Sequence, residues 1–277
     1  MYELFREPAT PLLPAAEAVA TLLCGSGTAS LGTDNHPGVD VLHARDHDGT
    51  VLVLAGADYV RELGVTATGD DVPARLDIAS YAPLPDLTIP RAIVQVVGWV
   101  RAVPASEVPG RLTATCYAGD FGTAFRSWPG ARLLALDVAE VSLHRSTGCE
   151  HLEPEDVVAA LPDPLARQEA ESLARLQETC GERLLGLVRA LGHAHTADRG
   201  RDIRLGDVHA VRATAVDRCG LTVRCTGVDR GGDSNPQSVS SIRIAFPQAV
   251  RTVDEAVDAL ALLALGQHSC AGRCPYL

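Results

Sequence analysis

The sequence predicts an α+β protein in which an antiparallel β-barrel is followed by a small domain of one long helix, several strands and a closing helix. Two observations support this. The first half of the 277 residues holds several short runs of strand composition, with turn signals and little helix between them. The second half opens with a long apolar repeat at intervals of three and four residues. Hydrophobic residues make up 46% of the chain and aromatic residues only 4%, so we expect a core of Leu, Val and Ala.

The barrel half begins with a helix predicted at residues 13–24, because its apolar positions recur at helical spacing. The turn Asp46-His47-Asp48-Gly49 is a hairpin signal between two strands. A short helix is predicted at 58–64. The strands are predicted at 28–33, 38–44, 50–55, 74–80, 92–103 and 132–144, the last of which could also be two strands.

The second half begins at Asp163-Pro164, which we interpret as the cap and first residue of one long amphipathic helix ending near Gly192. Strands are predicted at 208–216, 221–226 and 239–246. Thr252 and Glu255 have capping-box spacing and begin the last helix, which we expect to stop at Gly266. We therefore predict two domains, a barrel at 1–160 and an α+β domain with a C-terminal tail at 161–277.

Charge and composition exclude several classes of protein. The net charge is −11, which argues against general nucleic-acid binding, and no apolar run is long enough for a membrane span. Every basic residue is Arg, so no Lys is available for a Schiff base. Residues 1–10 lack the basic-then-apolar layout of a signal peptide, and we expect a cytoplasmic protein whose eight Cys are reduced.

Three stretches resemble a known family in their order and spacing. They are RAIVQVVGWVRAV at 91–103, the run from LALDVAEVSLHRSTGCEHLEP to ESLARL at 134–176, and AVDRCGLTVRC at 215–225 with IRIAFPQAVRTVDEAVDAL at 242–260. Together they resemble the bacterial haem-utilisation family, in which a split barrel like that of the flavin-binding pyridoxamine-phosphate oxidases precedes a small helix–strands–helix domain. The resemblance implies that the protein binds haem b. Members of this family include haem oxygenases and haem-trafficking proteins, and piperazate synthases look like relatives of the same barrel.

The resemblance suggests where a haem would be held. In haem-oxygenase relatives a His on the C-terminal loop ligates the iron, and His268 has that position here; Cys274, His43 and His36 are the alternatives. Arg91, Arg101 and Arg126 are candidates for binding the propionates. The family's trafficking members carry a His-rich helix where this chain reads Arg175-Leu176-Gln177-Glu178-Thr179-Cys180, so a ligand from that helix would have to be Cys180.

Other cofactors fit the sequence less well. His268, Cys270 and Cys274 could bind zinc, but a structural zinc site has four ligands. Flavin-binding barrels hold the phosphate with clusters of Arg, Lys, Ser and Thr, which residues 93–100 almost entirely lack.

The leading functional hypothesis is a haem-dependent enzyme acting on a small N–O substrate, as piperazate synthases do. The alternatives are a haem-degrading oxygenase and a non-catalytic haem carrier or regulator. We also expect a homodimer in which apolar strands such as 93–100 are buried against a second copy.

Overall fold

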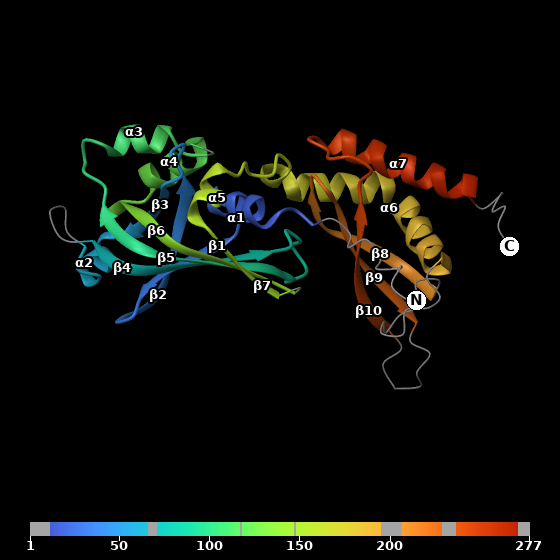
Figure 1. The fold of residues 1–277 in the computed structure, drawn as a ribbon, viewed down its shortest axis with the longest axis horizontal. Coiled ribbons are helices and arrows are strands. Elements are labelled where there is room, and N and C mark those ends of the chain that lie inside the picture. The colour runs from blue at the N-terminus through green and yellow to red at the C-terminus, as the bar shows by residue number, and fades with distance from the viewer. Residues whose placement is uncertain are drawn as a thin grey trace, which may run out of the picture. The chain divides into compact units, whose positions relative to one another are not determined.

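The protein was analysed as a computed structural model that describes residues 12–65, 71–116, 118–146, 148–194, 207–228 and 237–270. Side chains are not described at 118–119, 191–194, 228, 237–240 and 266–270. The described chain forms two compact units. The barrel unit comprises the described residues of Pro14–Ala82 and Asp86–Asp163. The C-terminal unit comprises the described residues from Pro164 onward together with Leu12, Leu13 and Pro83–Pro85. Figure 1 shows the elements of each unit.

The barrel unit is built on one antiparallel sheet in the order β3-β2-β1-β4-β5-β6-β7. Strand β3 also pairs with β6, from Val51 opposite Leu136 to Gly56 opposite Ala131, and this pairing closes six strands into a barrel. The predicted α+β class with an antiparallel barrel is therefore confirmed. The strands are β1 Thr28–Thr33, β2 His36–Arg45, β3 Val51–Gly56, β4 Val72–Tyr81, β5 Pro90–Ala102, β6 Ala131–Arg145 and β7 Gly148–Leu152.

Alternating side chains along the strands separate the barrel core from the outer face. In β4, Leu76 and Ile78 are fully buried inside the barrel, while in β5 Ile93, Val97 and Trp99 point outward and are exposed. A bulge lies between β5 and β6 at Val97/Gly98. Gly98 is required there, because a Cβ would lie 1.9 Å from the carbonyl oxygen of Asp137.

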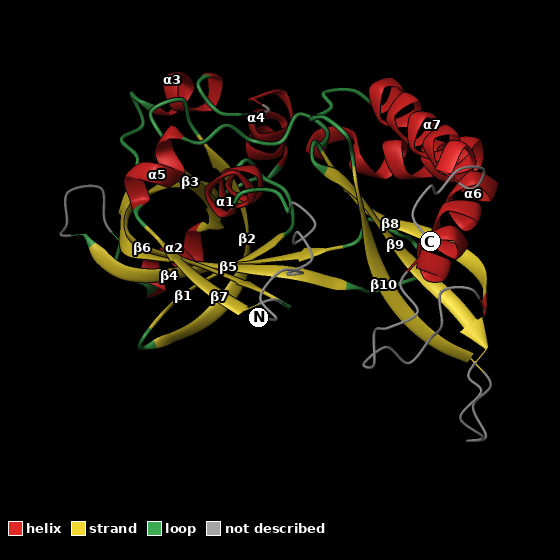
Figure 2. Ribbon diagram, turned by 45° about the vertical axis from the view of Figure 1, so that its right-hand side comes forward, coloured by secondary structure: helices red, strands yellow, loops and turns green. Residues whose placement is uncertain are grey.

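Short helices cover part of the barrel (Figure 2). Helices α3 (Val108–Thr113) and α4 (Ala118–Ser127) pack on the outer side of β2, β3 and β6, where Phe121 joins a cluster with Leu52 and Leu54. This second layer explains why β3 is buried on both faces. Helices α1 (Ala15–Leu23) and α5 (Pro154–Ala159) contribute Leu23 and Val157 to the barrel core, and α2 (Ala57–Glu62) adds Val60.

The C-terminal unit is a three-stranded antiparallel sheet in the order β10-β9-β8, packed against two helices. Its elements are the 3-10 turn η1 Ala166–Gln168, α6 Glu169–Ala194, β8 Val208–Asp217, β9 Gly220–Val228, β10 Gln237–Ala245 and α7 Val253–Cys270. The core is a single cluster in which Leu176, Leu184, Leu221, Val223 and Leu260 are completely buried. Leu and Val dominate it, as the composition predicted.

Two predicted helix ends were wrong. The long helix begins at Glu169 rather than at Asp163-Pro164, since Asp163 belongs to the barrel unit and its backbone N–H donates to Thr21 Oγ1 at 2.8 Å. The last helix begins as predicted, with the N–H of Glu255 donating to Thr252 Oγ1 at 3.2 Å, but it continues past Gly266 to Cys270. A glycine costs a helix about 1 kcal/mol relative to Ala without ending it, unless the chain turns left-handed there. His268 therefore lies on α7 and not on a loop beyond it.

Candidate functional site

A groove of about 540 Å³ lies on the outer face of the barrel, across β1, β2, β4 and β5. We call it the outer-face groove. Its polar lining includes His36, Asp34, Arg75 and Asp77, and its apolar lining includes Pro73 and Val97. The volume is within the range of about 300–1,000 Å³ that is usual for small-molecule and cofactor sites.

The tight β1–β2 hairpin places His36 at one end of this groove. The backbone N–H of His36 donates to Thr33 Oγ1 at 3.2 Å, and the Tyr59 hydroxyl donates to the carbonyl of Leu31 at 2.6 Å. Gly38, two residues further along β2, has to be a glycine because a Cβ there would lie 2.2 Å from Ser30 Oγ. The absence of a side chain at Gly38 makes room for Ser30 on the neighbouring strand.

Arg75 and Asp77 bring opposite charges to the same groove. They are two residues apart on β4 and so point to the same face, and Arg75 Nε lies 3.0 Å from Asp77 Oδ2. The second carboxylate oxygen, Asp77 Oδ1, is buried and has no hydrogen-bond partner among the described residues. Unpaired buried acceptors are uncommon, and such an atom can accept a hydrogen bond from a bound group.

A second imidazole lies on the outer face of the barrel, one strand further along the sheet. His144 Nε2 lies 3.2 Å from Gln95 Oε1 and 3.2 Å from Ser142 Oγ. Cys149 Sγ is 3.8 Å from the same nitrogen. Gln95 is also the cross-strand neighbour of Asp77. A continuous polar row therefore crosses β4, β5, β6 and β7.

His43 is not part of this face. Its side chain is buried, and its Nε2–H donates to the carbonyl of Leu22 at 2.7 Å. Burial lowers the pKa of His43, while this hydrogen bond raises it less, so the imidazole is neutral near pH 7. The His43 side chain therefore links β2 to α1 through this hydrogen bond.

The three predicted propionate ligands lie on separate parts of the barrel unit. Arg91 and Arg101 are ten residues apart on β5, which places them roughly 30 Å from each other. Arg91 donates to Ser80 Oγ at 3.2 Å. Arg126 lies on α4, where it donates to Thr123 Oγ1 at 3.1 Å. The structure does not bring the three together, and the guanidinium in the groove is that of Arg75.

Three of the predicted ligands in the C-terminal part of the chain fall outside the described residues: the side chains of His268 and Cys270, and the whole of Cys274. Cys180 is described: it is completely buried in the core, and burial raises the pKa of its thiol. Among the described residues no three His, Cys, Asp or Glu side chains form a metal-binding cluster.

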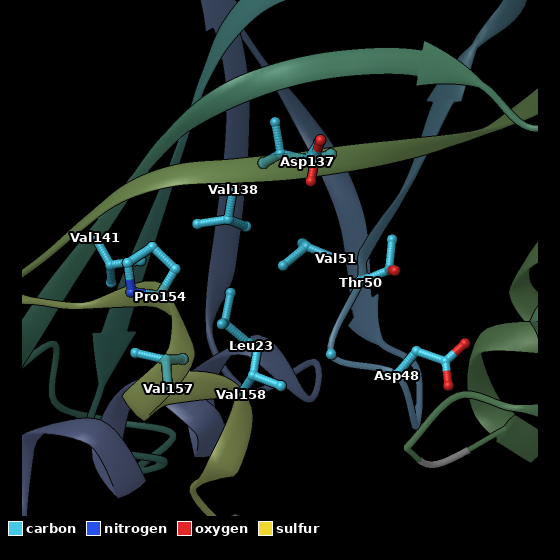
Figure 3. A pocket seen from close by; sticks show the side chains of 12 residues that line it. Leu23, Asp48, Thr50, Val51, Asp137, Val138, Val141, Pro154, Val157 and Val158 are labelled. Atoms are coloured by element: carbon cyan, nitrogen blue, oxygen red, sulfur yellow. The ribbon is translucent and has the colours of Figure 1, made fainter.

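A second, smaller hollow of about 150 Å³ lies beside α5 (Figure 3). Leu23, Val138, Val141 and Val157 form its apolar part, and Asp48 and Asp137 are its acidic residues. Its volume is well below that of a usual cofactor site. The outer-face groove is the larger candidate.

Of the groove's polar residues, the sequence singled out His36 alone. Arg75 and Asp77 stand at alternating strand positions, which predict that they point outward. Which residues of β5 and β6 lie beside them depends on the register of the sheet, which the sequence pattern does not contain.

A closed six-strand antiparallel barrel, with helices on part of its outer side and a separate small α+β unit, defines a protein of the split-barrel class. A haem-binding protein from Mycobacterium smegmatis has a similar solved structure, with a TM-score of 0.57, 19% sequence identity, and coverage of 94% of this chain and 100% of that one. A protein of unknown function from Agrobacterium tumefaciens is also similar, with a TM-score of 0.39, 19% identity and coverage of 92% and 97%.

No family model matches the sequence, and no curated protein matches it. No helix in the described part of the chain is long and apolar enough to cross a membrane.

Proposed function

We propose that the protein binds haem b, about one per chain, in the outer-face groove. The observation that carries this proposal is the groove itself, about 540 Å³ in volume with an imidazole and a guanidinium in its lining. The likeness in fold to a haem-binding protein supports it.

The residues of the groove fit the needs of a haem site. Such a site requires an axial ligand, apolar walls for the macrocycle and a cation for the propionates. His36 supplies an imidazole, and Pro73 and Val97 supply apolar wall. Arg75 supplies a planar guanidinium suited to carboxylates. When bound, haem would supply a Lewis-acidic iron.

Haem titration of the full chain tests the proposal. We expect a shifted Soret band that saturates at about one haem per chain. His36→Ala should alter the Soret and visible bands and weaken retention, whereas His47→Ala, a change in the exposed turn, should not. If the His36 variant behaves as wild type, His144→Ala and then His268→Ala identify the ligand. Cys274→Ala should leave an imidazole-ligated spectrum unchanged. A flavin spectrum without any haem-induced shift would contradict the proposal.

A second candidate function, catalysis on an amino-acid substrate at the same groove, is favoured by the Arg75–Asp77 pair. A free amino acid needs a cation for its carboxylate and an acceptor for its ammonium group, and Asp77 Oδ1 is a buried acceptor without a partner among the described residues. This would suit the chemistry expected from the resemblance, in which an N-hydroxylated ornithine loses its N–O bond to form an N–N bond.

Three assays on the haem-loaded protein separate the possible roles. Turnover of N5-hydroxy-ornithine with intact haem would indicate the N–N bond-forming enzyme, and Asp77→Asn should then raise the KM more than it lowers kcat. Loss of the Soret band with an electron donor and oxygen would indicate a haem oxygenase. Transfer of unchanged haem to apomyoglobin would indicate a carrier.

A further inference from the structure

Two cysteines that are 92 positions apart in sequence meet beside β2. Cys24 follows the last residue of α1, and Cys116 lies between α3 and α4. Their side chains lie close enough for each to affect the other's electrostatic surroundings. Neither takes part in a disulfide in this structure, where both are reduced.

Both segments are held at the C-terminal end of β2, the Cys24 segment at His43 and the Cys116 segment at Arg45 and the following Asp46. On the α1 side, His43 Nε2–H donates to the carbonyl of Leu22 at 2.7 Å, and a Cβ on Gly25 would lie 3.2 Å from His43 O. On the other side, the N–H of Cys116 donates to the carbonyl of Arg45 at 2.8 Å. The neighbouring pair Asp46–Thr115 forms an antiparallel bridge. The two thiols are therefore held near each other by fixed backbone on both sides.

We infer that Cys24 and Cys116 are a redox-active pair that forms a reversible disulfide when the protein meets a peroxide. The two residues differ in access: Cys24 is 1% exposed, whereas Cys116 is partly exposed. An oxidant therefore reaches Cys116 first. Cys24 lies behind it and serves as the resolving thiol.

The chemistry balances with hydrogen peroxide as the oxidant. The Cys116 thiol loses its proton, and its sulfur attacks one peroxide oxygen. The O–O bond breaks to give a sulfenic acid and hydroxide, and the hydroxide takes up the released proton and becomes water. Cys24 Sγ then attacks Cys116 Sγ and displaces hydroxide, which leaves as a second water with the Cys24 proton. Burial raises the pKa of Cys24 far above its ordinary value, so this residue stays a protonated thiol until its neighbour is oxidised.

Peptide mapping of the full-length wild-type protein tests the inference directly. The protein is treated with hydrogen peroxide, alkylated under denaturing conditions and digested with trypsin. The peptides at 7–45 and 112–126 each contain one cysteine, Cys24 and Cys116 respectively. We expect them to be recovered as one disulfide-linked species that a reductant separates. Recovery of the two as unlinked peptides, alkylated or singly oxidised, would overturn the inference, as would a dominant disulfide between other cysteines.

Matched variants provide a second measurement. Oxidation should raise the Tm of the wild type by about 5 °C or more, because the cross-link closes a long loop. Cys149→Ala removes an exposed cysteine and should retain this increase. Cys24→Ala and Cys116→Ala should each abolish it. If either variant fails to fold, the wild-type peptide map decides the question alone.

Discussion

Burial makes His43 a structural residue rather than a haem ligand. From its position on an early strand, His43 was a candidate haem ligand. The structure buries it and commits its Nε2–H to the carbonyl of Leu22. His36 lies only seven residues earlier on the same strand, and it lines the outer-face groove.

The lowered pKa of His43 predicts an acid-sensitive step in stability. In the unfolded chain its pKa is near the ordinary value of 6.5, and burial lowers it in the folded protein. Between these two values only the unfolded chain binds the proton, so the free energy of unfolding decreases as the pH falls below about 6.5, by at most about 1.4 kcal/mol per pH unit. The loss is complete once the pH passes the lower, folded value.

Urea denaturation between pH 5 and pH 7.5 measures this effect. His43→Asn should be less stable at pH 7, by about 1–3 kcal/mol, and should lose this component of the slope. His47→Asn, which replaces an exposed histidine of the adjacent turn, should keep the wild-type slope. Parallel pH profiles for wild type and His43→Asn would show that another group titrates.

At the scale of elements, a buried arginine stabilises the end of α5. The Arg45 guanidinium donates to the carbonyl oxygens of Val157 at 3.1 Å and Ala160 at 3.3 Å, and also to that of Val158. These are the carbonyls that a helix leaves unpaired at its C-terminus. With six residues, α5 has few internal hydrogen bonds, so it depends on this contact from β2.

Replacing this side chain should loosen α5. Arg45→Met keeps much of the apolar stem but removes the donors, and we expect the free energy of unfolding to fall by about 2–3 kcal/mol. Arg61→Met is the matched control. Its ion pair with Asp58 spans 3.0 Å between side chains that are 75% and 87% exposed, so the change should cost less than about 0.5 kcal/mol. Equal denaturation midpoints for the two variants would contradict the capping role.

The strands were largely predictable, because most have apolar residues at intervals of two and β3 is a continuous apolar run. The elements that the sequence did not predict lack such a pattern. Helix α3 reads VPGRLT, and α4 contains two glycines and two polar residues that favour turns. In β7, four of the five residues are exposed, since this strand only pairs along the edge of β6. These three elements form because the barrel provides a surface or an edge for them.

At the scale of the whole molecule, the apolar outer face of the barrel is uneven. Helices α3 and α4 cover β2, β3 and part of β6. On β5, Ile93 is 44% exposed and Trp99 is 47% exposed, with no described helix over them. Large exposed apolar side chains that share one face are typical of an interaction surface.

The homodimer expected from the sequence would bury this face. Light scattering at micromolar concentration should give a mass twice the 29.1 kDa of one chain. Ile93→Asp should reduce it to the mass of a single chain, because a carboxylate would be buried without a partner. Leu161→Asp changes an even more exposed leucine away from the strands and should leave the mass unchanged. A wild type with the mass of one chain would contradict the expectation.

The pairing that closes the barrel joins β3 to a strand about eighty residues later in the chain. During synthesis at about 5–20 residues per second, several seconds separate the two strands. Throughout that time the run VLVLAG has one hydrogen-bonding edge with no strand to pair with, and it is apolar on both faces. The nascent chain therefore exposes an apolar, aggregation-prone strand until β6 has been synthesised. Its yield in the cell should depend more on chaperones and translation speed than on the stability of the finished barrel.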